Sequence, residues 1–168
     1  MRIRVTRKQE NSRMCFVCGL KNPYGIKARF YELETGEVMA IFHPRDEHQS
    51  YPGRLHGGIA AAILDETIGR VGMIRFGEEM WGVTLAFRIR FRRPVPLDAE
   101  LRVIGRITGE TNRGFTGTGE ILLPDGRVGV EGEGRYLKLP IGKIADFDVE
   151  QEECGVVPDP ADPLEFEL

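Results

Sequence analysis

Long apolar runs, cysteine-rich segments and internal repeats are scarce or absent in this chain of 168 residues. No segment approaches the roughly 18 consecutive apolar residues of a transmembrane helix, so we expect no membrane association. The first 13 residues lack the apolar core of a secretory signal, and three cysteines are too few for a disulfide framework. Both absences favour a reducing, cytoplasmic location. The composition, 41% hydrophobic and 29% charged, is typical of one globular domain.

Basic residues are missing from the C-terminal end of the chain. Residues 146–168 contain nine acids and no lysine or arginine, together with three prolines, which predicts a mobile or surface-draped extension. The other 145 residues hold 23 basic and 17 acidic side chains, a net charge of about +6. An excess of this size suits an anionic ligand but is not typical of nucleic-acid-binding proteins, so we expect no nucleic-acid partner.

One long apolar helix is the dominant pattern in the middle of the chain. Residues 57–74 are apolar on nearly every side and end close to Gly77, which predicts a buried helix. A narrow stripe of small residues runs along it at spacings of four and three, so the helix can press closely on a sheet. The stripe consists of Gly58, Ala62, Asp65, Gly69 and Gly72.

Strand patterns flank this helix on both sides. The predicted strands, two before the helix and four after it, cover residues 28–33, 37–43, 83–91, 100–108, 115–123 and 127–139. Short turns between successive strands imply antiparallel pairing, and a single apolar helix needs a sheet wrapped around it. The predicted fold class is therefore α+β, with one curved antiparallel sheet around one long central helix. The exposed edges of such a sheet favour dimerisation by sheet extension.

The longest predicted strand, at residues 83–91, alternates between apolar and polar side chains. This period of two predicts one apolar and one basic face. The apolar positions are Val83, Leu85, Phe87, Ile89 and Phe91, and the positions that alternate with them are Thr84, Ala86, Arg88, Arg90 and Arg92. The alternation places Thr84 on the basic face.

His56-Gly57-Gly58 opens the central helix and is the most informative motif of the chain. Glycines at a helix start let a ligand approach free backbone N–H groups at the positive end of the helix dipole, which makes an anion or oxyanion site. Asp65 follows about two turns later, roughly 10 Å along the helix axis. Oxyanion donors combined with a carboxylate predict acyl transfer to water.

The two adjacent acids of the helix differ in their neighbours. Asp65 has no basic residue three or four positions away, and an unpaired carboxylate on an apolar stripe is costly and often catalytic. Glu66 has Arg70 four residues later, which predicts a structural ion pair. We therefore favour Asp65 as the functional acid, and Glu66 replaces it only if the helix is rotated from this estimate.

Cys15-Phe-Val-Cys18 has the spacing of half a zinc site. A structural zinc site needs four ligands, and only Cys154 and three histidines remain to complete it, with no second C-x-x-C. We therefore expect a reduced cysteine pair packed in a turn, and no metal.

These motifs and their order resemble the hotdog-fold thioesterases, specifically the phenylacetate-pathway (PaaI-like) type and the related human acyl-CoA thioesterases. The motifs that carry the resemblance are Cys15-Phe-Val-Cys18-Gly19, Asn22-Pro23-x-Gly25, His48-Gln49, Pro52-Gly53, His56-Gly57-Gly58, Asp65 and Arg93-Pro94-Val95. The chain is then divided into an N-terminal lead-in at residues 1–26, a hotdog thioesterase domain at residues 27–140 and an acidic extension at residues 141–168.

The resemblance implies an acyl-CoA thioesterase without metal or organic cofactor, acting as a homodimer or a dimer of dimers with the site between subunits. Asp65 is then the general base or nucleophile, the Gly57 N–H binds the thioester carbonyl, and Thr84 helps hold the attacking water. His56 either orients the loop, which we prefer, or protonates the leaving thiolate. A thiol with a pKa of ~8.5 is already a good leaving group near neutral pH.

Substrate contacts are expected from the loop before the helix and from the basic strand. Many relatives have an asparagine six residues before the histidine, where this chain has Ser50 next to Gln49. Either side chain donates to the substrate carbonyl, or this donor is missing, which costs ~10²–10³ in rate. Gly58, the second glycine of the motif, is also expected to let the substrate approach the backbone closely. Arg88 and Arg90 either bind the phosphates of CoA or belong to a solvated face.

Two other functions stay open. The departure at Ser50 supports a non-catalytic module that binds acyl-CoA or another small ligand. A hotdog dehydratase is disfavoured, because such relatives carry a histidine five residues after the aspartate, where this chain has Arg70. A screen of acyl-CoA thioesters separates the first two, since only an enzyme releases the thiol.

Overall fold

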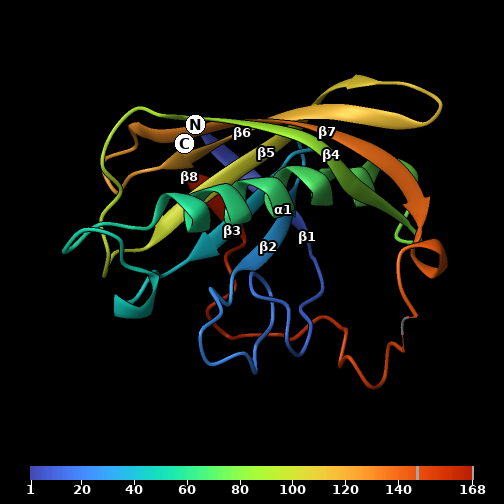
Figure 1. The fold of residues 1–168 in the computed structure, drawn as a ribbon, viewed down its shortest axis with the longest axis horizontal. Coiled ribbons are helices and arrows are strands. Elements are labelled where there is room, and N and C mark those ends of the chain that lie inside the picture. Colours follow the sequence, from blue (N-terminus) through green and yellow to red (C-terminus); the bar gives the residue numbers. More distant parts are fainter. Residues whose placement is uncertain (147, 168) are drawn as a thin grey trace.

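A curved, eight-stranded antiparallel sheet wraps around one α-helix in the computed structural model, which describes residues 1–146 and 148–167 (Figure 1). Helix α1 (Gly57–Phe76) lies across the concave face of the sheet. The strands are β1 (Arg2–Lys8), β2 (Arg29–Leu33), β3 (Val38–Phe42), β4 (Met80–Phe91), β5 (Leu101–Glu110), β6 (Gly114–Leu122), β7 (Val128–Pro140) and β8 (Glu165–Glu167). Short 3-10 helices lie at Asp46–His48 and Ile141–Lys143. The predicted fold class is confirmed.

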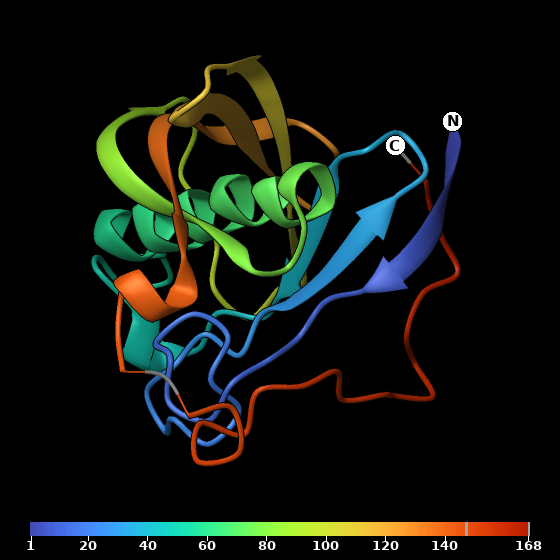
Figure 2. The same ribbon diagram turned by 90° about the vertical axis from the view of Figure 1, so that its right-hand side faces the viewer.

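The order of strands across the sheet is β4-β7-β6-β5-β3-β2-β1-β8. Six of these strands are the predicted ones, with ends shifted by no more than three residues. The other two, β1 and β8, come from the flanking segments and pair with each other at the far edge of the sheet (Figure 2). They escape prediction because β8 has three residues and β1 carries mostly charged side chains. Their buried residues, Ile3 and Phe166, pack on Tyr31.

Helix α1 begins and ends at residues suited to those positions. His56 is the N-cap, and its Nδ1 accepts a hydrogen bond from the Gly58 N–H at 2.9 Å. Gly77 ends the helix with φ of 91°, a conformation that glycine adopts without strain. Close packing on the sheet also requires glycine, because a Cβ at Gly105 would lie 3.0 Å from the Thr67 carbonyl oxygen. Neither α1 nor any other helix of the described residues has the length and hydropathy that crossing a membrane requires.

A β-bulge in β4 changes the predicted alternation of this strand. The pairing with β7 shifts between Thr84 and Ala86, so Leu85 is the extra residue. Thr84 therefore faces the helix, as do Phe87 and Ile89, which pack against the core. The prediction that Thr84 shares a face with the arginines is wrong, because the bulge reverses the alternation beyond it.

The acidic C-terminal segment is draped over the first strands of the sheet. Lys8 Nζ contacts both carboxylate oxygens of Asp162, at 2.6 and 2.8 Å, and the Tyr31 hydroxyl donates to the same carboxylate at 2.7 Å. Phe147 and Leu168 of the predicted extension lie outside the described residues. The division of the chain at residues 26 and 140 stays a prediction, although the sheet continues on both sides of it.

Candidate active site

Hydroxyl groups from two neighbouring strands hold the Asp65 carboxylate. Thr84 Oγ1 of β4 donates to it, at 2.9 Å from Oδ1 and 3.0 Å from Oδ2. The Tyr136 hydroxyl of β7 lies 3.0 Å from Oδ1 and 3.1 Å from the Asp65 backbone carbonyl oxygen. Thr84 and Tyr136 are directly opposed in the β4–β7 register, so both reach the same turn of α1. The structure thus brings together the predicted Asp65 and Thr84 and adds Tyr136.

Tyr136 is a donor that the sequence did not reveal. It is buried, with 1% of its surface exposed, and stacks on Phe115 with ring centroids 4.9 Å apart. Burial and the adjacent Asp65 charge raise the pKa of Tyr136 well above its ordinary value, so the hydroxyl keeps its proton. Tyr136 is 71 residues from Asp65, and only the register of β4 against β7 identifies it.

Asp65, Thr84 and Tyr136 line one pocket of about 580 Å³ between α1, β4 and the terminal segments. A pocket of this size accommodates a small ligand or an acyl group. Its wall includes the apolar side chains of Met73 and Trp81. Four further acids line it, namely Glu10, Glu66, Asp146 and Glu152. This acidic wall repels phosphate groups, so the pocket suits a ligand group without negative charge.

The start of α1 presents an unused backbone donor. The Gly58 N–H is taken by the His56 side chain, which supports the loop-orienting role that we preferred for His56. Within residues 1–146 and 148–167, the Gly57 N–H makes no hydrogen bond. The Phe91 ring of β4 lies over this point, since a Cβ at Gly57 would be 3.1 Å from Phe91 Cζ.

The two halves of the predicted machinery are far apart within one protomer. Gly57 is the first residue of α1 and Asp65 lies eight residues later. At the rise of an α-helix, these residues are about 12 Å apart along the axis. One thioester carbonyl cannot contact both, so they cooperate only if a second copy of the chain supplies one of them.

The predicted donors of the loop before the helix contact backbone groups of their own loop. Gln49 Oε1 accepts from the Gly53 N–H at 2.9 Å, and Ser50 Oγ lies 3.5 and 3.4 Å from the carbonyl oxygens of Arg54 and Leu55. Both side chains are exposed. Neither forms a hydrogen bond with Asp65 in the described part of the chain, so the loop and the acid are separate features of one protomer.

Arg88 and Arg90 are exposed on β4, the edge strand of the sheet. Neither forms an ion pair with any residue that the structure describes, whereas Arg92 pairs with Glu131 at 2.9 Å. The Arg93 guanidinium donates to a backbone carbonyl at 2.7 Å. Arg88 and Arg90 are therefore the two guanidinium groups of this strand that remain available to an anionic ligand.

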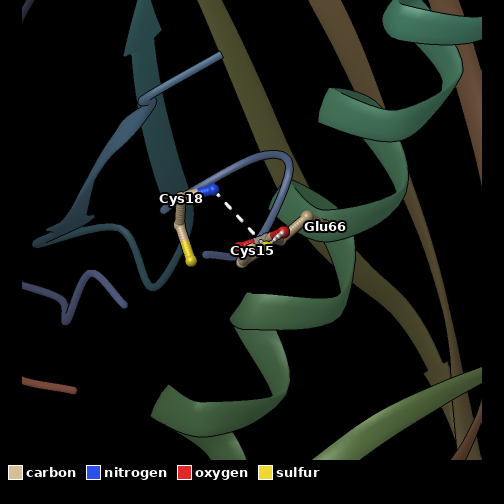
Figure 3. Close-up of side chains that lie close together, drawn as sticks. All are labelled: Cys15, Cys18 and Glu66. Atoms are coloured by element: carbon tan, nitrogen blue, oxygen red, sulfur yellow. Dashed lines mark hydrogen bonds between the residues drawn. The ribbon is translucent and has the colours of Figure 1, made fainter. Parts of the chain in front are cut away.

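Glu66 forms the predicted ion pair with Arg70, at 2.9 Å, and also contacts Cys15 (Figure 3). Cys15 Sγ lies 3.4 Å from Glu66 Oε2, and the Cys18 N–H points at the same sulfur at 3.5 Å. Cys15, Cys18 and Cys154 are free thiols that line the pocket. Cys15, Cys18 and Glu66 offer a metal ion three donor atoms, one fewer than a structural zinc site uses.

The known proteins that this chain resembles in sequence are thioesterases. Residues 52–130 match the family model described as thioesterase superfamily. Human acyl-coenzyme A thioesterase THEM5 is 31% identical over 70 residues, which cover 42% of this chain and 27% of that protein. The chain therefore spans about a quarter of the length of this curated relative.

Solved structures extend the similarity to most of the fold. Thioesterase superfamily protein RHA08564 is 30% identical, with a TM-score of 0.59, over 66% of this chain and 53% of that one. The smu.793 protein of Streptococcus mutans, solved bound to acetyl CoA, is 18% identical, with a TM-score of 0.57, over 62% of this chain and 82% of that one. At 18% identity, the similarity to the Streptococcus mutans protein concerns the fold alone.

Proposed function

Because residues 52–130 match the thioesterase superfamily model and the fold is the hotdog fold of thioesterases, we propose that this protein hydrolyses acyl-CoA thioesters to a free acid and CoA. The observation that carries this proposal is the Asp65 carboxylate, held by Thr84 and Tyr136 at a pocket of acyl size. The similarity to human THEM5, an acyl-coenzyme A thioesterase, supports the same substrate class.

The proposed active form is a homodimer, alone or within a dimer of dimers, in which two β4 strands pair edge to edge. Three features support this pairing: β4 has no neighbour on one side among the described residues, and Leu85 and Phe91 each expose 55% of their surface along it. A two-fold axis at this edge lays the two α1 helices side by side in opposite directions. The partner's Gly57 then approaches Asp65, which removes the separation of about 12 Å.

In the proposed reaction, Asp65 takes a proton from water, whose oxygen attacks the thioester carbonyl carbon. The Thr84 hydroxyl donates its hydrogen bond to Asp65 and keeps its proton, so its oxygen lone pairs are free to accept a hydrogen bond from that water. The oxyanion receives the N–H of the partner's Gly57 and the positive end of that helix dipole. Collapse breaks the carbon–sulfur bond, and the CoA thiolate takes up the proton. Direct attack by Asp65 through an anhydride is the alternative step.

This chemistry requires neither a metal nor an organic cofactor, because a carboxylate supplies the base and a backbone amide supplies the oxyanion donor. The phosphates of CoA are proposed to lie along β4 at Arg88 and Arg90, outside the acidic pocket. The start of the partner's helix borders the thioester with the partner's Gly58, the partner's Gln49 and the partner's Ser50. The PaaI-like subtype and a cytoplasmic location remain part of this proposal.

The test is a screen of aromatic, short-chain and long-chain acyl-CoAs with a thiol-trapping dye. Asp65→Asn is expected to abolish turnover of an accepted substrate while the melting temperature is kept. Asp162→Asn is the matched control, because Asp162 also accepts a tyrosine hydroxyl but lies away from the pocket. Undiminished turnover by Asp65→Asn contradicts the assignment, and calorimetric binding of CoA thioesters without thiol release favours the binding module.

A further inference from the structure

The turn from Cys15 to Cys18 holds two thiols close together against α1 (Figure 3). The Gly19 N–H donates to the Cys15 carbonyl at 2.8 Å, which winds the segment into one helical turn. In such a turn, Cα atoms three residues apart lie about 5 Å from each other, within the range that disulfides span. The two sulfur atoms also lie within 4.8 Å of each other. A disulfide between them therefore requires side-chain rotation rather than a new backbone conformation.

The two thiols differ in exposure and in their tendency to ionise. Cys15 is exposed and Cys18 is buried. The nearby Cys18 thiol, together with the Cys18 N–H that points at the Cys15 sulfur, lowers the pKa of Cys15 to about 7, against the opposing effects of burial and of the Glu66 charge. The nearby Cys15 sulfur, together with burial, raises the pKa of Cys18. Near neutral pH, a substantial fraction of the accessible Cys15 is thus thiolate, whereas Cys18 behind it is a protonated thiol.

Charged neighbours also favour a stepwise reaction of the pair. The Glu66 carboxylate opposes a second negative charge at this site, but Arg70 pairs with it at 2.9 Å and is itself mostly buried. Arg70 also favours the Cys18 thiolate, which has to form if Cys18 is to attack Cys15. The environment therefore supports one exposed nucleophile and one buried resolving thiol.

From this arrangement we infer that Cys15 and Cys18 are a redox pair that undergoes thiol–disulfide exchange with low-molecular-weight disulfides. The Cys15 thiolate attacks one sulfur of the small disulfide, forms a mixed disulfide and releases the first thiolate. Cys18 gives its proton to that thiolate, attacks Cys15 Sγ and expels the second thiolate. The two cysteines lose two electrons, and the small disulfide gains them as one thiol and one thiolate, which takes up a proton from water.

This inference concerns thiol chemistry and does not depend on the proposed hydrolysis. The test uses the full chain with oxidised glutathione as the probe and mass spectrometry of acid-trapped samples as the readout. The wild-type protein is expected to form the Cys15–Cys18 disulfide with a short-lived adduct. Cys18→Ser is expected to accumulate glutathione on Cys15, and Cys15→Ser to react at least about tenfold more slowly. Cys154→Ser, which removes the third thiol of the pocket, is the matched control and oxidises like the wild type.

Four results overturn the inference: a lasting glutathione adduct on the wild-type protein, a disulfide that includes Cys154, an undiminished rate in Cys15→Ser, or a bound zinc ion that blocks oxidation until it is chelated. The last result would assign the turn to metal binding. If Cys18→Ser does not fold, as judged by thermal melting, Cys18→Ala replaces it with the same readout, and the wild-type time course alone still decides.

Discussion

Removal of the Tyr136 hydroxyl isolates the least expected contact of the candidate site. Tyr136→Phe keeps the ring, which is buried and stacked on Phe115, so the packing of β7 on α1 is preserved. The substitution deletes one donor to the Asp65 carboxylate and leaves the Thr84 donor in place. The carboxylate then keeps its charge but loses one of the two contacts that orient it.

The expected effect is larger on catalysis than on folding. A hydrogen bond to a charged group contributes about 1.5–3 kcal/mol, and loss of a positioning contact at a reacting group costs about 10- to 100-fold in rate. We therefore expect kcat/KM of Tyr136→Phe to fall about 10- to 100-fold, chiefly through kcat. The free energy of unfolding should fall by about 1 kcal/mol, less than the full value of such a bond, because the Thr84 hydroxyl still donates to the carboxylate.

Tyr31→Phe supplies a matched control for this experiment. Tyr31 is as buried as Tyr136, and its hydroxyl also donates to an aspartate, Asp162, at 2.7 Å. Tyr31 lies away from the pocket, so removal of its hydroxyl should lower the free energy of unfolding without changing kcat. Both variants are assayed by thiol release from an accepted acyl-CoA and by thermal melting. Equal activity of Tyr136→Phe and the wild type, or an equal loss of activity in both variants, refutes the positioning role.

Three further variants test other parts of the structure. Gly57→Pro removes the free N–H at the first helical position, which tolerates proline, and should lower kcat about 10²–10³-fold. Gly57→Ala keeps the N–H beside Phe91, so its kcat should fall less. Equal losses of kcat in the two variants contradict the oxyanion role. Leu85→Lys should produce monomers in light scattering and lose activity, whereas Leu164→Lys, an exposed position away from β4, should not. Asp162→Asn should lower the free energy of unfolding by about 1–3 kcal/mol at pH 7. Although burial opposes it, hydrogen bonds from Lys8 and Tyr31 lower the pKa of Asp162, so this contribution is complete above the ordinary carboxyl pKa of about 4 and disappears at lower pH; a difference from the wild type that persists in acid would contradict it.

The fold was predictable because its signals are local and periodic. Helix α1 is marked by its apolar pattern and by Gly77, and six strands are marked by alternation and turn residues. The two remaining strands lack such signals. β8 consists of Glu165–Glu167, and it becomes a strand only because β1 offers an edge for pairing. A local pattern carries no information about a partner that lies more than 150 residues away.

The candidate site was predictable only in part, for the same reason. Asp65 stands out because an unpaired acid on an apolar helix is unusual, and its contact with Thr84 is present in the structure. Tyr136 and the Cys15–Glu66 contact depend on strand register and on the path of the N-terminal segment. The bulge at Leu85 has no glycine or proline to announce it, and it reverses the face on which Thr84 lies.

β4 connects the proposed chemistry to assembly of the proposed dimer. Through the bulge, its Thr84 reaches Asp65 in the middle of α1, and its Phe91 covers Gly57 at the start of the same helix. The outer edge of this strand is unpaired in the described part of the protomer. If two copies pair at this edge, each helix start meets the middle of the other helix, and both sites are completed together. A folded monomer would therefore keep the Asp65 pocket but lack the oxyanion donor, and it should bind acyl-CoA without hydrolysing it.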